Sequence, residues 1–275
     1  KDKDKYVEFL LGLDISSNIN EAARRFYQSH TSKGLSMFLQ YDTSKSITNG
    51  DGLMNKSDKK YHDVLFTDNK TTIDKKYKLL GKKGFDLVSS QFSFHYYFKD
   101  EDTLRGYLHN VSSLLTKGGY FIGTCYDGHK IFETLKKGDI EMTDELGNLV
   151  YSIKKNYDLD NFDYDPSDNN CYGKEINVYM STIGQELPEY LVNFEFAIDI
   201  MKEYDLELVD IKDTTITGKG IGSFEDIIDN LETIKEKDSF LKSRKAKDIL
   251  TMKNNSNRKL KELSSFNNWF IFQKS

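Results

Sequence analysis

The chain has 275 residues, of which 37% are hydrophobic, and a net charge of −5 from 39 basic and 44 acidic residues. This apolar content is enough to bury a core, whereas the acidic balance argues against a protein coated in positive potential. No run approaches the ~18 apolar residues that a membrane helix needs, so we expect no membrane partner. Cys125 and Cys171 have no metal-ligand spacing, which predicts neither a zinc site nor a disulfide framework.

The first segment is typical of a strand that ends in an acid and is followed by a helix. Residues 6–13 are apolar enough for a strand and lead directly into Asp14. Ser16 and Ser17 are candidate N-caps of the next helix, whose apolar side consists of Ile19, Ala22, Ala23, Phe26 and Tyr27. Such an acid holds a ribose in nucleotide-binding α/β domains, but Asp at a strand end is also a common turn residue. Both interpretations of Asp14 stay open.

A second acid follows a second predicted strand. Residues 43–60 are rich in Ser, Lys, Asn, Asp and Gly, which indicates a surface loop. Residues 64–67 are a short apolar run, and Asp68 comes directly after them. We therefore expect Asp68 at the carboxyl end of a strand.

The centre of the chain predicts a right-handed βαβ unit. Residues 85–88 are an apolar run typical of a buried strand, which closes at Gln91. A helical pattern then runs to residue 115 and stops at residues 117–119, where glycine can take the left-handed conformation. Residues 120–125 form a second strand, and strand, crossover helix and strand make a parallel pair.

Polar side chains are expected along one edge of this sheet. Ligands of open α/β sheets lie beyond the carboxyl ends of the strands. Asp14, Asp68 and Gln91 each close a predicted strand, and an aromatic cluster with His95 and Tyr96 follows Gln91. The sequence therefore predicts a nucleoside-sized site at this edge.

The second half of the chain contains an insertion. A short helix over residues 129–135 precedes two alternating strands, 149–153 and 175–181, so we place a β-rich insertion at about residues 140–186. A helix is expected from Leu187 to about residue 204, because Pro188 suits a first helical position and Glu189 suits the helix dipole.

The last part of the chain predicts a return to the main sheet. Residues 206–211 are typical of a strand, residues 224–234 of a helix, and residues 235–261 are charged and rich in lysine. Residues 269–272 close the chain as a strand that can pair antiparallel with the sheet. The expected fold is α/β, with a mostly parallel sheet, an antiparallel C-terminal strand and the β-rich insertion.

At this point the sequence resembles the mRNA cap guanine-N7 methyltransferases, which are class I S-adenosylmethionine-dependent methyltransferases. The resemblance is carried by FDLVSSQFSFHYYF at 85–98, LLTKGGYFIGT at 114–124 and LPEYLVNFEFAIDIMKEYDLELV at 187–209. VEFLLGLDIS at 7–16 and VLFTD at 64–68 fall in the expected order, so the similarity covers nearly the whole chain. It implies a Rossmann-like sheet in a single domain over residues 1–275, typical of the C-terminal part of a large-DNA-virus capping enzyme.

The resemblance implies a role for seven residues. The cofactor-binding residues are Asp14 for the ribose, Asp68 for the adenine, Gln91 for the methionine or ribose part, and Tyr96. The substrate-binding residues are Arg25 for the cap phosphates, His95 and Tyr96 at the junction of cofactor and cap, and Glu189 for the guanine. A carboxylate can accept hydrogen bonds from both the ring N–H and the exocyclic amine of guanine, which other bases reproduce less well.

The implied reaction is methyl transfer from S-adenosylmethionine to N7 of the mRNA cap guanine, with S-adenosylhomocysteine as product and no metal. Guanine N7 carries a lone pair and no proton, so no catalytic acid or base is expected and His95, Tyr96 and Glu189 act by positioning. The implied partners are the capped 5′ end of mRNA and other capping-enzyme domains in the same chain. The expected location is intracellular: cytoplasm or virion for a viral enzyme, nucleus for a cellular one.

One departure from the family opens an alternative. The strand and glycine-rich loop that precede the Asp14 strand in the family, and that lay backbone N–H groups against the cofactor, are missing. We expect a domain truncated at its N-terminus. The alternative is a catalytically inactive methyltransferase-like subunit that stimulates a capping enzyme, and a small-molecule methyltransferase on the same fold is a third interpretation.

Overall fold

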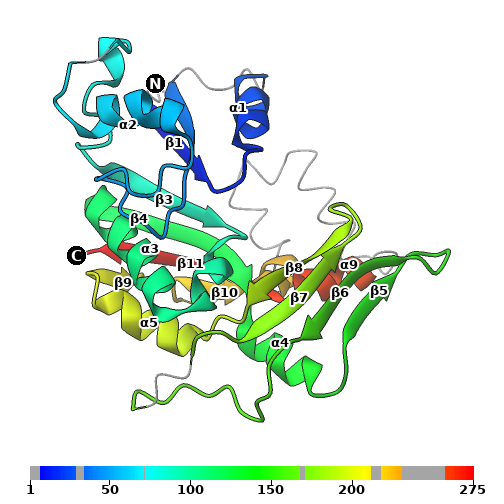
Figure 1. Cartoon of the computed structure of the whole chain (residues 1–275). Helices are drawn as coiled ribbons and strands as arrows, with labels where there is room; N and C mark the ends of the chain where they lie inside the picture. The colour runs from blue at the N-terminus through cyan, green and yellow to red at the C-terminus, as the bar shows by residue number, and fades with distance from the viewer. Residues whose placement is uncertain (1–6, 29–33, 71, 168–170, 212–217, 231–257) are drawn as a thin grey trace. The chain divides into compact units, whose positions relative to one another are not determined.

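The structure is a computed structural model, and it describes residues 7–28, 34–70, 72–167, 171–211, 218–230 and 258–275. The chain divides into two compact units. The first consists of Lys1–Asp86 and Asp102–Thr116, and the second of Leu87–Glu101 and Lys117–Ser275. Helices and strands alternate along most of the chain, which confirms the α/β class (Figure 1).

The first unit begins with a parallel strand pair joined by a helix. Strand β1 (Phe9–Asp14), helix α1 (Ile19–Gln28) and strand β2 (Leu35–Gln40) follow in order, as the sequence predicts for the first two. β1 and β2 pair in parallel, so that Asp14 lies opposite Gln40 at their shared carboxyl end. The apolar side of α1 is only partly covered, since Tyr27 remains 61% exposed.

The predicted strand at residues 64–67 is wrong, because these residues end a helix. α2 (Lys59–Phe66) follows the 3-10 helix η1 (Lys56–Asp58). A run of four apolar residues does not separate a strand from a buried helix. Val64 and Leu65 are both buried, and their carbonyls accept hydrogen bonds from the amides of residues 79 and 82, which complete the helix end. Together with β2 they form a core of Met37, Leu39, Tyr41, Ile47, Val64, Leu65, Phe66 and Leu114.

The predicted surface loop at residues 43–60 is tied to the core by one buried asparagine. Asn110 is 2% exposed and accepts a hydrogen bond from the amide of Ile47 at 2.9 Å. Its amide nitrogen donates to the carbonyls of Thr43 and Lys45 at 2.8 and 2.7 Å. A loop that satisfies its backbone through a buried side chain keeps one conformation.

The predicted βαβ unit is confirmed, with two local corrections. β3 (Phe85–Gln91), α3 (Glu101–Leu114) and β4 (Leu115–Tyr126) follow in order, and β3 neighbours β4 in one sheet. The Thr116 hydroxyl donates a hydrogen bond to the Phe85 carbonyl, and the amide of residue 92 donates to the Thr124 carbonyl. The starts of the two strands are therefore neighbours, as are their ends, so the strands run parallel.

The first correction concerns burial and the second concerns the end of the helix. β3 is not a buried strand, since Leu87 is 51% exposed and only Ser90 is buried. Helix α3 ends at Leu114, earlier than residues 117–119. Gly118 has the predicted positive φ of 79°, but within the first part of β4.

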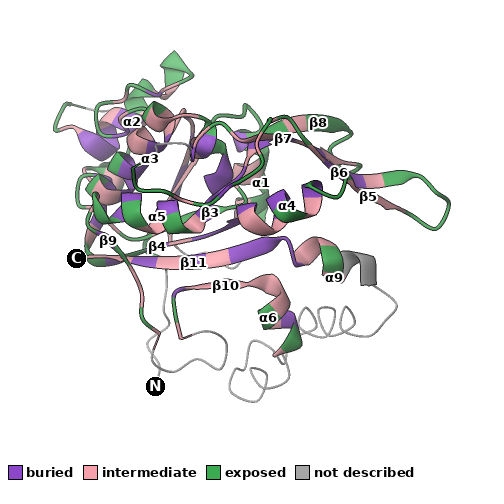
Figure 2. Cartoon of the chain, turned by 90° about the horizontal axis from the view of Figure 1, so that it is seen from below, coloured by how far each residue is buried: buried purple, intermediate pink, exposed green. Residues whose placement is uncertain are grey.

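The main sheet of the second unit ends in an antiparallel strand, as predicted. Its order is β10–β11–β4–β3, and β9 pairs with another part of β11. β11 (Asn267–Lys274) runs antiparallel to β4, to β9 (Leu206–Leu208) and to β10 (Ile221–Ser223). Buried and partly buried residues succeed one another along β11, and Phe270 and Phe272 are within the core (Figure 2).

The insertion is a four-stranded antiparallel sheet that packs on α4 (Gly128–Leu135). Its strands, in the spatial order β5–β6–β7–β8, are β5 (Ile140–Thr143), β6 (Leu149–Lys155), β7 (Glu175–Met180) and β8 (Gln185–Tyr190). Their shared core with α4 contains Tyr126, Ile131, Phe132, Leu135, Tyr151, Ile153, Phe162, Ile176, Val178, Leu191 and Phe266.

The predicted helix start at Leu187 is wrong, because this segment is the last strand of the insertion. Pro188, in β8, lies opposite Asn177 of β7. Among the described strands β8 pairs with β7 alone, and such an edge strand is where a sheet tolerates proline. The helix begins later, as α5 (Phe194–Lys202), with the side chain of Asn193 accepting from the amide of residue 196. The insertion sheet therefore runs to residue 190 and contains Glu189.

The predicted helix at residues 224–234 is confirmed in its first part. α6 (Phe224–Asp229) covers the first part of the expected helix 224–234, and α9 (Arg258–Ser264) lies at the end of the lysine-rich segment. Residues 231–257 lie outside the described residues. In the described part of the chain, no helix has the length and apolar content to cross a membrane.

We expect Asn110→Ala to lower the free energy of unfolding by about 2–4 kcal/mol, because three hydrogen bonds are lost and their backbone partners stay buried. Urea denaturation measures this loss. Asn69→Ala, at an exposed position, is the matched control and should change stability by less than about 0.5 kcal/mol. Equal stabilities of the two variants would contradict the role assigned to Asn110.

Candidate functional site

The seven predicted site residues divide between the two units. The first unit contains Asp14, Arg25 and Asp68, and the second contains Gln91, His95, Tyr96 and Glu189.

Two of the predicted residues, His95 and Tyr96, meet at the carboxylate of a third, Glu189, in the second unit. Glu189, on β8, is 6% exposed, and β7 places it opposite the apolar Ile176. The 3-10 helix η3 (Phe94–Lys99) carries His95 and Tyr96. The Tyr96 hydroxyl donates to Glu189 Oε1 at 3.2 Å, and His95 Nε2 lies 3.3 Å from Glu189 Oε2. Residues 93 positions apart in sequence therefore form one polar cluster.

Burial controls the charge of Glu189. Loss of water raises the pKa of this carboxyl to about 7, while the hydroxyls of Tyr96 and Tyr126 act in the opposite direction. Oε2 is buried, and no residue in the described part of the chain gives it a hydrogen bond. A buried acceptor without a partner is costly, so this oxygen is a candidate to bind a ligand donor.

His95 is a neutral ring held between two tyrosines. Burial lowers the pKa of its imidazole to about 3. The ring stacks on Tyr126 with centroids 5.3 Å apart, and the Tyr96 ring lies against it at a tilt of 51° with centroids 4.3 Å apart. The contact between His95 and Glu189 is a polar contact and not an ion pair, because the ring is neutral. Neither ring nitrogen has a hydrogen-bond partner among the described residues.

Two tyrosines of this cluster are missing from the sequence prediction. Tyr126 ends β4, one position beyond the predicted strand, and Tyr151 lies in β6. The Tyr151 hydroxyl donates to that of Tyr126 at 3.2 Å, and burial raises the pKa of both phenols. The position of Tyr126 at the carboxyl end of a strand was the available signal, since this is the edge where ligands of α/β sheets lie.

Gln91 closes β3, as predicted, but its amide is engaged within the protein. Thr124 donates to its oxygen at 3.1 Å, and its nitrogen donates to Ser89 at 3.0 Å. The residue is exposed at the strand end. Its side chain is thus oriented by neighbours on β3 and β4.

Asp14 closes β1, as predicted, and serves the turn that follows. Its Oδ1 accepts the amide of Ser16 at 2.8 Å, and the Ser16 hydroxyl accepts the amide of Asn18. Asp14 is exposed. The turn interpretation therefore holds for Oδ1, while Oδ2 is left to solvent or a ligand.

Asp68 does not close a strand, whereas Arg25 lies on a helix, as the sequence predicts. Asp68 follows helix α2, and Lys78 Nζ lies 2.6 Å from its Oδ1, which lowers the pKa of this carboxyl. Arg25 lies on α1 with a side chain 71% exposed, 3.7 Å from the carboxylate of Glu21. Asp68 is therefore paired, and Arg25 presents its charge to solvent.

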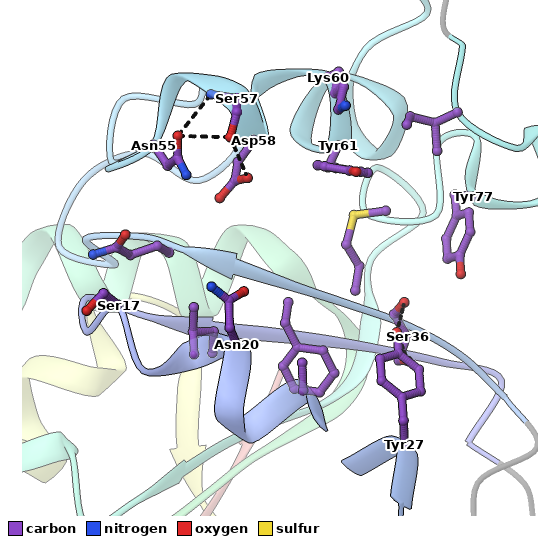
Figure 3. Close-up of a pocket in the computed structure, with 16 residues that line it drawn as sticks. Ser17, Asn20, Tyr27, Ser36, Asn55, Ser57, Asp58, Lys60, Tyr61 and Tyr77 are labelled. Atoms are coloured by element: carbon purple, nitrogen blue, oxygen red, sulfur yellow. Dashed lines mark hydrogen bonds between the residues drawn. The ribbon is translucent and has the colours of Figure 1, made fainter. Parts of the chain in front are cut away.

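A cavity of about 720 Å³ lies within the first unit, between α1 and α2 across β2 (Figure 3). Ser17 and Gln40 line the end next to Asp14, which lies opposite Gln40. Its labelled lining residues in Figure 3 are Ser17, Asn20, Tyr27, Ser36, Asn55, Ser57, Asp58, Lys60, Tyr61 and Tyr77. Hydroxyl, amide and aromatic groups thus surround a space beside the predicted ribose-binding acid.

The described residues contain no group of three His, Cys, Asp or Glu side chains arranged to hold a metal ion. Cys125 and Cys171 are buried, and among the described residues they form no disulfide.

Comparison with known proteins supports the predicted resemblance. The mimivirus "probable mRNA-capping enzyme" (Acanthamoeba polyphaga mimivirus) is 32% identical over 220 residues, which is 74% of this chain and 18% of the relative. The Schizosaccharomyces pombe mRNA cap guanine-N(7) methyltransferase is 28% identical over 75% of this chain and 48% of the relative. The Aspergillus niger enzyme of that name is 34% identical over 46% of this chain and 20% of the relative. The chain thus spans less than half the length of these curated relatives.

Among solved structures, a putative S-adenosylmethionine dependent methyltransferase from Listeria monocytogenes is 14% identical, with a TM-score of 0.46 over 98% of this chain and 80% of that one. The family model of the mRNA (guanine-N(7))-methyltransferase domain matches residues 1–274. Because this match covers nearly the whole sequence, the chain belongs to the mRNA (guanine-N(7))-methyltransferase domain family.

Proposed function

We propose that the protein transfers the methyl group of S-adenosylmethionine to N7 of the guanine cap of mRNA. The observation that carries this proposal is the buried Glu189 carboxylate, whose Oε2 has no hydrogen-bond partner among the described residues and lies beside His95 and Tyr96. Family membership gives the reaction class, and the cluster gives a reason why guanine is the base.

Guanine is recognised by the pattern of its donors. Its N1–H and exocyclic amine form two neighbouring donors, which a carboxylate can accept together. Tyr96 already occupies Glu189 Oε1 in part, while Oε2 is open. A base without the two donors leaves a buried carboxylate unpaired, and this raises the free energy of the wrong complex. His95, neutral and fixed by stacking, orients the base without adding charge.

The cofactor-binding residues are proposed to be Asp14, Asp68, Gln91 and Tyr96. Asp14 fits best, because its exposed carboxylate uses Oδ1 for the turn and can bind a ribose hydroxyl through Oδ2. Asp68 has to give up part of its contact with Lys78 to bind an adenine amine. When bound, S-adenosylmethionine supplies a methyl group activated on a sulfonium.

The residues of this chain contribute position and not proton transfer. Guanine N7 holds a lone pair and no proton, so the bond from N7 to the methyl carbon forms while the carbon–sulfur bond breaks, and no base is needed. Holding the reacting atoms in line can supply several kcal/mol. Glu189, His95 and Tyr96 are therefore positioning groups for the guanine, which agrees with the pKa of His95 being too low for proton exchange near neutral pH.

The proposed substrate is the capped 5′ end of mRNA. Arg25 is exposed on α1 and is proposed to face the cap phosphates. The mimivirus relative is a capping enzyme of which this chain covers only 18%, so we propose further capping domains as partners. The reaction then takes place where mRNA is capped: cytoplasm or virion for a virus, nucleus for a cell.

The single-domain organisation remains part of the proposal, and the family model spanning both units supports it. The inactive-subunit alternative is less well supported, because a domain without substrate has no use for a buried carboxylate with an open oxygen. Incubating the full-length protein with labelled S-adenosylmethionine and GTP-capped RNA tests the proposal. Labelled N7-methylguanine after nuclease digestion is the expected result, and saturable cofactor binding without any methylation would favour the alternative.

We expect Glu189→Gln to reduce affinity for a guanine cap analogue at least tenfold, because one acceptor is replaced by a donor; a buried charged hydrogen bond is worth about 1.5–3 kcal/mol. Equilibrium titration with the cap analogue measures this change. Binding of an inosine-capped analogue, which lacks the exocyclic amine, should be affected less. Equal losses for both caps would contradict recognition of guanine by Glu189.

The same variant provides a stability control with a defined sign. The pKa of Glu189 rises from 4.5 to about 7 on folding, so the folded protein binds the extra proton between these values and stability falls as pH rises through them. Relative to Glu189→Gln, the wild type should lose about 3 kcal/mol between pH 4.5 and pH 8. Urea denaturation at both pH values measures this difference, and the neutral His95 contributes equally to both proteins.

We expect Asp14→Asn to weaken S-adenosylhomocysteine binding about tenfold or more, because a neutral amide nitrogen then takes the place of the charged Oδ2 that accepts the ribose hydroxyl. Isothermal titration measures the affinity. Glu21→Gln, an exposed acid on α1, is the matched control and should bind as the wild type does. An unchanged affinity of the Asp14 variant would leave Asp14 a turn residue only.

A further inference from the structure

The cavity between α1 and α2 is large enough for one nucleotide. Its volume is about 720 Å³, within the usual range of small-ligand pockets. Side chains from α1, β2, η1, α2 and the 3-10 helix η2 (Lys75–Tyr77) line it, and all of these elements belong to the first unit (Figure 3). None of the described residues that line it has a role in the proposed methyl transfer, so its walls are free to bind something else.

Tyr27, on α1, lines this cavity with a ring that is exposed and yet held in place. The residue is 61% exposed. Its hydroxyl donates to the Ser36 carbonyl at 3.4 Å and accepts from the Ser36 hydroxyl at 3.0 Å, which ties the far end of the ring to β2. An exposed ring whose orientation is already set is a platform on which a nucleobase can stack at a low cost in side-chain entropy.

Two further tyrosines line the cavity from the side of α2 (Figure 3). Tyr61 comes from α2 and Tyr77 from η2, and both pack partly on the core of the first unit. Their hydroxyls can each donate and accept a hydrogen bond. Neutral groups of this kind suit the edge of any base, which favours binding without a defined sequence.

The elements on this side of the cavity carry an excess of positive charge. η1, α2 and η2 contain five lysines and two aspartates, in a chain whose net charge is −5. Lys59 is paired with Asp63. Lys60 lines the cavity, with its Nζ 4.9 Å from the centroid of the Tyr61 ring, and has no carboxylate partner among the described residues. Its charge is therefore available to a phosphate.

We propose that this cavity is a subsite for single-stranded RNA, in which a base stacks on Tyr27 and Lys60 binds a backbone phosphate. The inference rests on the proposed function, which makes RNA the substrate. It adds a contact with the RNA chain that is separate from recognition of the guanine by Glu189, which belongs to the other unit. A free nucleotide also offers a base and a phosphate, so the test includes both ligands.

The test is titration of the full-length protein with a labelled, uncapped oligouridylate, followed by fluorescence anisotropy. Tyr27→Leu keeps an apolar side chain and removes the ring, and it should weaken binding at least about fivefold through loss of base stacking. Tyr27→Phe keeps the ring and should bind within about threefold of the wild type. The matched control is Tyr120→Leu, at a tyrosine of the second unit that is 42% exposed, which should bind as the wild type does. Equal losses in Tyr27→Leu and Tyr120→Leu would overturn the proposal.

Salt dependence tests the phosphate contact. Lys60→Gln should make the fall of log K with log salt concentration less steep by about 0.7, the value for one phosphate of a single strand, whereas Tyr27→Leu should leave this slope unchanged. Lys83→Gln is the matched control, since Lys83 is exposed in the same unit and does not line the cavity. A slope that changes equally in both lysine variants would indicate a general charged surface and contradict the proposal.

Uncapped RNA separates this inference from the proposed function. A wild type that binds the oligouridylate, with the losses expected for Tyr27→Leu and Lys60→Gln, supports the subsite even if no cap is methylated. A wild type that methylates the cap while both variants bind the oligouridylate normally overturns it. Uridine monophosphate that binds as tightly as the oligouridylate, or S-adenosylhomocysteine that displaces it, would assign the cavity to a small ligand and also overturn the proposal.

Discussion

The candidate site depends on one constraint, a carboxylate that must be able to ionise where water is excluded. Burial raises the pKa of Glu189 to about 7, so near neutral pH the charged form is close in free energy to the protonated one. The hydrogen bond from the Tyr96 hydroxyl offsets part of this cost. Under the proposed function, the remaining deficit makes Glu189 selective, because a ligand with two donors restores the missing hydrogen bonds and one without them does not.

The strand that carries Glu189 explains how a charged side chain becomes buried. Successive side chains of a strand point to opposite faces, so Pro188 and Glu189 face different sides of β8, and Glu189 is the buried one. Among the described strands β8 pairs with β7 alone, so its other edge can hold a proline, which has no N–H to donate to a further strand. A helix at this position would turn neighbouring side chains by about 100° and would not alternate exposure in this way.

The sequence was informative where a long pattern had one solution. The periodicity of residues 101–114, followed by an apolar strand, fits only a helix in a βαβ unit, and the structure agrees. Four-residue runs failed, because the segment before Asp68 fits a strand and a buried helix end equally well. Glu189 was placed in the wrong element, since proline suits both a first helical turn and an edge strand.

What the sequence could not provide are the contacts that hold the site residues in place. Asn110 reaches a backbone amide 63 positions away, and Tyr126 meets a hydroxyl 25 positions away. Each contact depends on sheet register, and a shift by one residue would turn the side chain to the other face. A family resemblance identifies side chains by their position in a motif and gives no information about the register between strands. The side chains around Glu189 therefore become visible only when η3, β4 and β8 are seen together.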